Sequence, residues 1–128
     1  MNILDENIDA PQRERLRAWR IHFRRIGGDL GHAGMKDLDE IIPLLHTLKR
    51  PTFFTRDHDF YDPGLRHAEY GLVYLDAAPD EAAHYIRRFL RHRACRAQTQ
   101  RMGKVVRVHP IGLSYWQVGV EKERAISW

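Results

Sequence analysis

Two acidic segments, each just behind a short apolar run, are the residues of this chain best suited to metal chemistry. Residues 51–54 lead into Asp57 and Asp59, and residues 2–4 lead into Asp5. A short β-prone run between polar residues predicts a buried strand. In an open α/β sheet, ligands bind at the carboxyl ends of the strands. If the two strands are neighbours in one sheet, these acids come together.

Carboxylates that lie this close need a compensating charge. Two like charges about 4 Å apart repel by about 4 kcal/mol at an effective dielectric constant of 20, so the cluster requires a cation or a shared proton. Hard divalent ions such as Mg²⁺ take oxygen ligands. Such ions generate a hydroxide and absorb charge on a leaving oxygen, which are the two needs of phosphodiester hydrolysis. The sequence therefore predicts an acidic metal site.

The composition is that of one folded domain. The chain has 128 residues, of which 43% are hydrophobic and 30% charged. This length is sufficient for a core, and these fractions argue against disorder. A single cysteine, Cys95, excludes an internal disulfide. No segment resembles a signal peptide or a membrane-spanning helix, so we expect a cytoplasmic protein without membrane association.

Charge is distributed unevenly along the chain. Residues 1–81 contain 15 Asp and Glu against 11 Lys and Arg, whereas residues 82–120 contain eight Lys and Arg and no acid. The charges of the remaining tail cancel, which leaves a net charge of +4. This asymmetry indicates an acidic metal site beside a surface that faces a polyanion.

The first half of the chain is expected to alternate strands and helices. Asp9 is expected to cap a helix that ends near residue 18. Residues 19–26 alternate apolar and basic side chains, which predicts a second strand. An apolar stripe within residues 38–48 predicts a second helix, and residues 52–55 form the strand that leads to Asp57.

The second half continues the pattern. Residues 72–75 predict a strand, and residues 79–81 begin a helix with an apolar stripe. Residues 93–103 lack periodicity and are expected to form a mobile basic loop. Residues 104–108 and 113–120 alternate around a turn and predict a closing pair of strands. Alternating strands and helices predict an α/β fold, with helices on both faces of a mostly parallel sheet.

Three acidic motifs follow one another along the first 60 residues. They are Leu4-Asp5-Glu6-Asn7, Gly34-Met35-Lys36-Asp37-Leu38-Asp39-Glu40-Ile41 and Thr55-Arg56-Asp57-His58-Asp59-Phe60. Together they resemble the hallmarks of PIN-like domains, most closely the small bacterial branch related to VapC-type toxins of toxin–antitoxin pairs. The resemblance covers about residues 1–76, and the basic remainder matches only in outline. It implies one PIN-like domain over residues 1–128, with a three-layer α/β/α fold and a Mg²⁺- or Mn²⁺-dependent endoribonuclease site.

The resemblance carries site roles to particular acids of this chain. It implies catalysis and metal binding by Asp5, Asp57 and Asp39, with Glu6, Asp59, Asp37 and Glu40 as supporting acids. Asp39 is favoured as the helix acid and Asp37 as the helix cap, but a shift of one or two positions exchanges their roles. Glu6 is an extra acid that either ligates the metal or binds a neighbouring backbone amide. Asp5 and Asp57 could also be ordinary turn-capping acids.

The basic part of the chain, residues 82–120, is expected to face RNA. Arg87, Arg88 and Arg91 are spaced to meet successive phosphates if they share one solvent-facing side of a helix. The same face could instead dock an acidic antitoxin or a second copy of the chain. The alternatives to a ribonuclease are a catalytically silent PIN-like module that binds nucleic acid or a partner, and a plain binding domain that uses the basic third.

Overall fold

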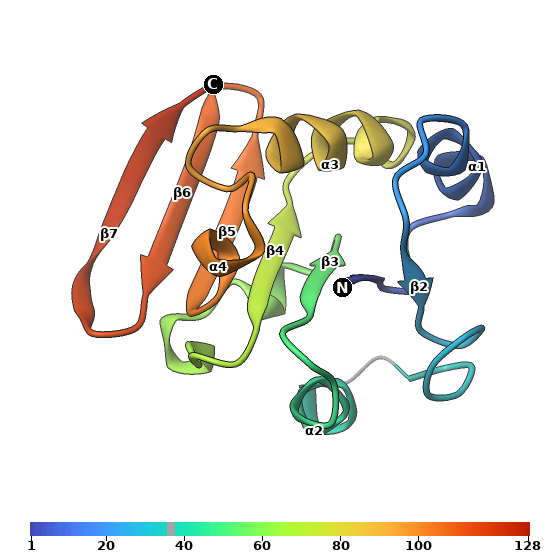
Figure 1. Ribbon diagram of the computed structural model, residues 1–128, viewed down its shortest axis with the longest axis horizontal. Helices are drawn as coiled ribbons and strands as arrows, with labels where there is room; N and C mark the ends of the chain where they lie inside the picture. Colours follow the sequence, from blue (N-terminus) through green and yellow to red (C-terminus); the bar gives the residue numbers. More distant parts are fainter. Residues whose placement is uncertain (36–37) are drawn as a thin grey trace.

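A seven-stranded sheet forms the centre of the computed structural model, which describes residues 1–35 and 38–128 (Figure 1). The strands are β1 (Asn2–Leu4), β2 (Arg24–Arg25), β3 (Thr52–Thr55), β4 (Gly71–Leu75), β5 (Lys104–His109), β6 (Gly112–Gln117) and β7 (Val120–Ser127). Their order across the sheet is β2-β1-β3-β4-β5-β6-β7. The first five strands in this order run parallel, and β6 and β7 extend the sheet in antiparallel fashion. The predicted α/β fold with a mostly parallel sheet is confirmed.

Short helices connect the strands. They are α1 (Ala10–Ala18), α2 (Leu38–His46), α3 (Ala82–Arg91) and α4 (Gln98–Arg101), with 3-10 turns η1 (His58–Phe60), η2 (Pro63–Leu65) and η3 (Pro79–Glu81). Across residues 1–35 and 38–128, no helix combines the length and the apolar character needed to cross a bilayer. The predicted helix over residues 38–48 ends at His46, two residues earlier than expected.

Two rows of side chains, one on each face of the sheet, make up the core. The strand register aligns Leu4, Phe54, Val73 and Val106 in one row, and Ile3, Phe53, Leu72 and Val105 in the other. The first row packs with residues of α1 and α3, and the second with residues of α2. Because successive residues of a strand point to opposite faces, a strand buried on both sides reads as a continuous apolar run. This explains the run at β3, where all four residues are buried.

Local signals position α1, and one buried side chain docks it. The Asp9 carboxylate accepts a hydrogen bond from the Gln12 amide at 3.3 Å, as expected of an N-cap, and Pro11 occupies the first turn. The side-chain oxygen of Gln12, which is buried, accepts from the Ala83 amide at 2.9 Å. Helix α1 is thereby tied to the first residues of α3.

The segment between α1 and the acidic loop is less regular than its sequence pattern indicates. A strand over residues 19–26 is wrong in extent, since only Arg24–Arg25 pairs with β1. Trp19 is the C-cap of α1, and Arg20 has a left-handed backbone with φ of 60°. Trp19, Ile21 and Phe23 still pack against the core cluster of α1 and α3, and Ile26 is buried in the cluster on the other face. The alternation of apolar and basic residues therefore reflects which side chains are buried, although most of the segment is a turn and irregular chain.

The expectation of a mobile basic loop over residues 93–103 is also wrong. The segment contains α4, and Arg101 is buried with 8% of its surface exposed. The Arg101 guanidinium donates hydrogen bonds to the Cys95 carbonyl at 2.9 Å and to the Thr52 hydroxyl at 3.0 Å. The basic side chain thus anchors the segment to the amino end of β3.

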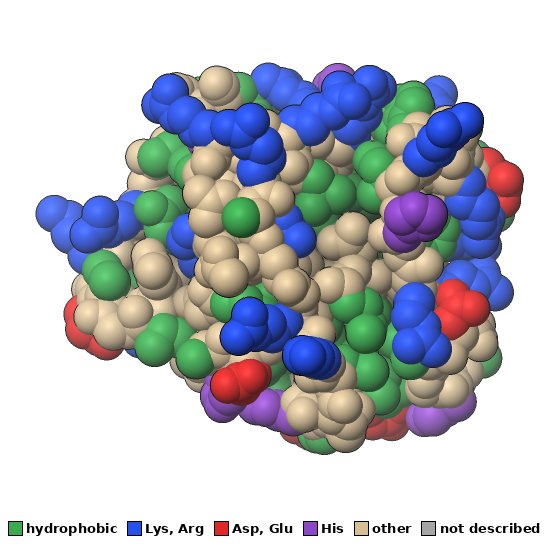
Figure 2. Space-filling model, in the orientation of Figure 1, with side chains coloured by type: hydrophobic (Ala, Val, Ile, Leu, Met, Phe, Trp, Pro, Cys, Tyr) green, Lys and Arg blue, Asp and Glu red, His purple; other side chains and the backbone are tan. Residues whose placement is uncertain are grey.

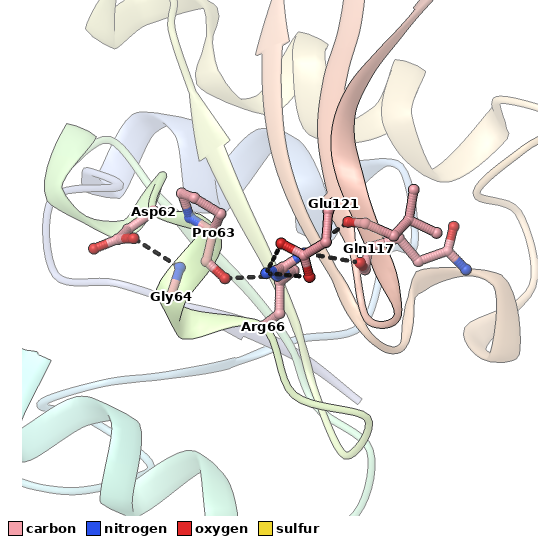
Figure 3. Close-up of polar contacts among 7 residues, drawn as sticks. Asp62, Pro63, Gly64, Arg66, Gln117 and Glu121 are labelled. Atoms are coloured by element: carbon pink, nitrogen blue, oxygen red, sulfur yellow. Dashed lines mark hydrogen bonds and ion pairs between the residues drawn. The ribbon is translucent and has the colours of Figure 1, made fainter.

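One arginine holds the final hairpin in place (Figure 3). The predicted strand over residues 113–120 ends at Gln117, and a further strand, β7, follows a turn. Arg66, just after η2, donates hydrogen bonds to the Val120 carbonyl at 2.7 Å and the Gln117 carbonyl at 3.3 Å. It also donates to the Pro63 carbonyl at 2.7 Å and pairs with Glu121. This contact joins the turn of the hairpin to the loop that precedes β4.

Candidate functional site

The acidic motifs meet where the strand order reverses. Strand β1 lies between β2 and β3, and all three are parallel, so the chain moves to one side of β1 and then to the other. The crevice outside the carboxyl ends of strands at such a reversal is the usual ligand site of open α/β sheets. Asp5 directly follows β1, and Asp57 lies two residues beyond β3. The prediction that these acids follow adjacent parallel strands is confirmed.

The Thr55 hydroxyl connects the two strand ends. It donates a hydrogen bond to Asp5 Oδ2 at 2.7 Å and accepts one from the Asp57 amide at 3.0 Å. It also accepts from Asn7 Nδ2 at 3.3 Å, and Asn7 Oδ1 accepts from the Arg56 amide at 3.0 Å. Thr55 itself is fully buried. These bonds hold the Asp5 carboxylate in one orientation at the edge of the sheet.

Asp5 is a buried acid among like charges. It is 5% exposed, and its second oxygen accepts a hydrogen bond from the Glu6 amide at 2.7 Å. Burial raises the pKa of the Asp5 carboxyl, and the charges of Asp57 and Glu6 act in the same direction. The hydrogen bonds from Thr55 and the Glu6 amide oppose this shift. A cation beside Asp5 would favour its ionised form, and binding of the cation would therefore release a proton.

Asp57 makes two hydrogen bonds at this edge of the sheet, one through its carboxylate and one through its backbone amide. Its carboxylate accepts a hydrogen bond from the Asp59 amide at 2.9 Å and so caps the turn η1. Its backbone amide donates to the Thr55 hydroxyl that binds Asp5, and its charge acts to raise the pKa of the Asp5 carboxyl. Asp59 is exposed. The capping role predicted as the simple alternative is therefore present, and it coexists with the approach to Asp5.

Glu6 connects β1 to the glycine-containing loops. Its Oε1 accepts a hydrogen bond from the Gly34 amide at 2.8 Å. A Cβ at Gly27, whose φ is 83°, would lie 3.0 Å from the Glu6 side chain. The positive φ favours glycine at this position, and a Cβ would press on the Glu6 carboxyl group. Of the two predicted roles of Glu6, the bond to a backbone amide is the one observed.

The two described acids at the start of α2 are surface residues. Asp39 and Glu40 are exposed in the first turn of α2, and Glu40 pairs with His32 at 3.4 Å. Asp37 lies outside the described residues. In the described part of the chain, no group of three His, Cys, Asp or Glu side chains is placed to hold a metal ion. The structure thus links Asp5 to Asp57 through the Thr55 hydroxyl, and among the described residues no acid of α2 pairs with either of them.

Two acids suffice for one kind of metal site. Mg²⁺ keeps several water molecules and is commonly held by one or two carboxylates together with phosphates of the substrate. Asp5 and Asp57 supply oxygen ligands of this type, and the hydrogen bond from Thr55 orients one of them. The donor set therefore fits Mg²⁺ or Mn²⁺.

Two arginines that the sequence analysis did not single out also reach this edge. A small pocket of about 80 Å³ is lined by Asp5, Glu6, Arg13, Arg25, Ile26 and Gly27. Arg13 comes from α1, and Arg25 ends β2, where it is paired with Leu4. The sequence shows only that basic residues occur in these two elements. Their meeting beside Asp5 depends on β2 lying next to β1.

The arginines of α3 are partly engaged with aromatic rings. The Arg87 guanidinium lies 4.5 Å from the ring centre of Trp19, and that of Arg88 lies 4.3 Å from the ring centre of Trp128. Both arginines are half-buried, whereas Arg91 is exposed. Figure 2 shows Lys and Arg side chains gathered along the upper edge of the molecule, over α3. The expected basic surface is present, and two of its three guanidinium groups lie over aromatic rings.

The edge formed by β1, β2 and β3 thus combines oxygen ligands for a cation with guanidinium groups suited to an anion. Such a combination can bind a divalent ion and a phosphate side by side.

No family model, curated protein or solved structure matches the chain.

Proposed function

We propose that the chain is a three-layer PIN-like domain that hydrolyses RNA phosphodiesters with Mg²⁺ or Mn²⁺, as the toxin-like member of a toxin–antitoxin pair. The observation that carries the proposal is the meeting of Asp5 and Asp57 through the Thr55 hydroxyl at the reversal of strand order. The resemblance of the three acidic motifs to PIN-like domains supports the same assignment.

Each side chain at the edge has a role in this proposal. Asp5 and Asp57 would hold the divalent ion, with Asp39 as the third catalytic acid and Glu6, Asp59, Asp37 or Glu40 in support. When bound, the ion supplies an activated water and neutralises charge on the leaving oxygen. Thr55 orients the Asp5 carboxylate, so that one of its oxygens keeps a fixed direction. Asp5 must give up its proton for this role, and metal binding should therefore weaken at low pH.

The basic surface would bind the RNA backbone. Residues 82–120 carry eight Lys and Arg and no acid, and Arg87, Arg88 and Arg91 lie on α3 among them. Stacking on Trp19 and Trp128 positions two guanidiniums while leaving their edges as donors. Contacts of this kind give affinity and depend on salt, and they carry little sequence information.

A catalytically silent PIN-like module is the second candidate. Three of the proposed acids already have structural partners: Asp57 caps η1, Glu6 accepts from the Gly34 amide, and Glu40 pairs with His32. If these roles are the whole function of the acids, the domain would bind RNA, an antitoxin or a second copy of itself without turnover.

The substitution Asp57→Asn separates the two candidates. Asn retains an oxygen that can cap η1, so the fold should persist while Mn²⁺ affinity and RNA cleavage are lost. Asp62→Asn is the matched control, because Asp62 caps the neighbouring turn η2 in the same way, through the Gly64 amide at 2.8 Å. Calorimetry with Mn²⁺ and cleavage of a fluorescent RNA would be measured on both variants.

The outcomes are distinct. Loss of Mn²⁺ binding and cleavage in Asp57→Asn alone supports the ribonuclease. Cleavage by Asp57→Asn at the wild-type rate would rule out a catalytic role for Asp57. RNA binding by a wild-type protein that neither binds Mn²⁺ nor cleaves would establish the silent module.

A further inference from the structure

We propose that Arg13 and Arg25 form a phosphate-binding pocket beside Asp5, which receives one backbone phosphate of single-stranded RNA. This inference rests on the proposed function and adds to it the residues that place the phosphate. The pocket is separate from the basic surface over α3, because α1 and β2 supply its two arginines.

The size of the pocket suits a small polar group. Its volume is about 80 Å³, and a water molecule takes about 30 Å³ in the liquid. A group of a few heavy atoms fits in this space. Polar or charged side chains from three elements surround the space, and Ile26 and Gly27 complete its lining.

The side chains of Arg13 and Arg25 each have a contact outside the pocket. Arg13 donates one hydrogen bond from Nη1 to the Ile8 carbonyl at 2.8 Å, which leaves other donors of its planar group for a ligand. The Arg25 side chain lies against Gly28, where an added Cβ would be only 2.1 Å from its Nε. The Arg25 amide is bound by Asp29 Oδ2 at 3.1 Å. A ligand would therefore meet an Arg13 guanidinium that is fixed by a hydrogen bond and an Arg25 side chain that packs against Gly28.

The pocket brings together two guanidinium groups and two carboxylates. In the described residues, the ion pairs of the chain lie elsewhere, and none joins Arg13 or Arg25 to Asp5 or Glu6. Burial lowers the pKa of the Arg13 guanidinium, and the charges of Arg25 and Arg17 lower it further, while those of Asp9 and Glu14 act in the opposite direction. An anion between Arg13 and Arg25 would relieve this repulsion.

The chemistry of the lining favours phosphate over other anions. Guanidinium groups bind phosphate oxygens through paired, charge-assisted hydrogen bonds. Asp5 and Glu6 repel a lone anion, so the pocket should bind its anion best when a divalent ion compensates these carboxylates. A phosphate can contact such an ion and both arginines at once, because it offers several oxygens. Phosphate and divalent cation should therefore bind with positive coupling, each raising the affinity of the other.

The test compares two double variants with the same change in charge. Arg13→Gln/Arg25→Gln alters the pocket, and Arg15→Gln/Arg24→Gln alters the exposed neighbours on the same two elements. Binding of a labelled single-stranded RNA would be followed by fluorescence anisotropy at several salt concentrations, with Ca²⁺ present in place of Mg²⁺. The pocket variant should bind at least about tenfold more weakly, with a salt slope reduced by about 0.7. The control variant should keep the wild-type affinity and slope.

A second measurement observes the arginines directly. In the wild-type protein with Ca²⁺, inorganic phosphate should shift the Nε–H NMR signals of Arg13 and Arg25 and leave those of Arg15 and Arg24 in place. Arg13→Gln removes the bond to the Ile8 carbonyl, so Arg25→Gln alone provides a variant in which this bond is kept. Thermal unfolding of every variant would show whether the fold is retained.

Failure of this inference differs from failure of the proposed function. Equal RNA affinity in the two double variants, with no phosphate-dependent shift at Arg13 or Arg25, would overturn the pocket, even if Asp57→Asn abolishes cleavage. Reduced affinity in the pocket variant together with unimpaired cleavage by Asp57→Asn would retain the pocket and reject the ribonuclease site.

Discussion

Strand β3 carries a buried threonine at each end, and each threonine contacts a buried charge in a different way. At the amino end, Thr52 accepts a hydrogen bond from Arg101, whose other donors reach backbone carbonyls. At the carboxyl end, Thr55 donates to Asp5, which lies among further acids. Arg101 and Asp5 are similarly buried, at 8% and 5% exposure. Two side chains that are buried to a similar extent therefore differ in their surroundings: Arg101 has hydrogen-bond acceptors around it, and Asp5 has other acids.

The difference lies in how each charge is compensated. Arg101 is surrounded by acceptors, and it connects α4 to the sheet by three such bonds. Asp5 receives two hydrogen bonds, yet neighbouring Asp57 and Glu6 oppose its ionisation. Breaking the hydrogen bonds of a buried charge is costly to the fold, whereas a buried charge among like charges favours binding of a counter-ion. This contrast separates an anchoring end of β3 from a ligand-binding end.

Loss of the arginine should have the largest effect on stability. Arg101→Met would leave the Cys95 and Arg96 carbonyls and the Thr52 hydroxyl without their donor. Unpaired buried polar groups cost about 1–3 kcal/mol each before relaxation, so we expect a total loss of about 3 kcal/mol in the free energy of unfolding. Urea denaturation measures it. A loss below about 1 kcal/mol would show that Arg101 is not an anchor.

Removal of the hydroxyl at the other end should have an intermediate effect. Thr55→Val keeps the volume but removes the donor to Asp5 and the acceptor for the Asp57 amide. We expect a loss of about 1–2 kcal/mol and weaker Mn²⁺ binding, because Asp5 is no longer oriented. Thr52→Val is the matched control and should leave Mn²⁺ affinity unchanged. Equal loss of Mn²⁺ affinity in the two variants would contradict a site confined to the carboxyl end.

Neutralisation of the acid should change stability least. Asp5→Asn keeps an acceptor for Thr55 and loses the one for the Glu6 amide, but it also removes the repulsion from Asp57 and Glu6. These effects oppose each other, so the free energy of unfolding should change by less than about 1 kcal/mol near neutral pH. Mn²⁺ binding should nevertheless be lost. Asp5→Asn should thus have a small effect on stability and a large effect on metal affinity, whereas Arg101→Met should have a large effect on stability.

The same variant gives a prediction for pH. Burial raises the pKa of Asp5 in the folded protein above its usual value of 3.8. The folded state therefore holds this proton more tightly than the unfolded state, and the resulting stability is present below pH 3.8 and lost as the pH rises through the folded pKa. Relative to Asp5→Asn, the wild-type protein should therefore become less stable as the pH increases from 3.8 through the folded-state pKa of Asp5. Unfolding curves at several pH values would contradict the assignment if the difference between the two proteins is constant.

Local sequence signals predicted most of the parallel sheet. The strands at residues 2–4, 52–55 and 72–75 and the cap at Asp9 depend on neighbouring residues, and the structure has them at or within one residue of the expected positions. Strand β7 was not predicted, because most of its side chains are exposed on both faces and leave no alternation. Its pairing with the backbone of β6 determines its conformation.

The acids at the candidate site were identified by their place after apolar runs, but their partners were not. The sequence by itself determined that Asp5 and Asp57 each follow a strand, since a strand and its end are set by local residues. Tertiary structure decided that Thr55 joins these acids across 50 residues of chain, and that Arg13 and Arg25 meet beside Asp5. It also decided that Arg101 is a buried anchor. The physical reason is that burial and hydrogen bonding between distant segments depend on strand order and helix docking, which no local pattern encodes.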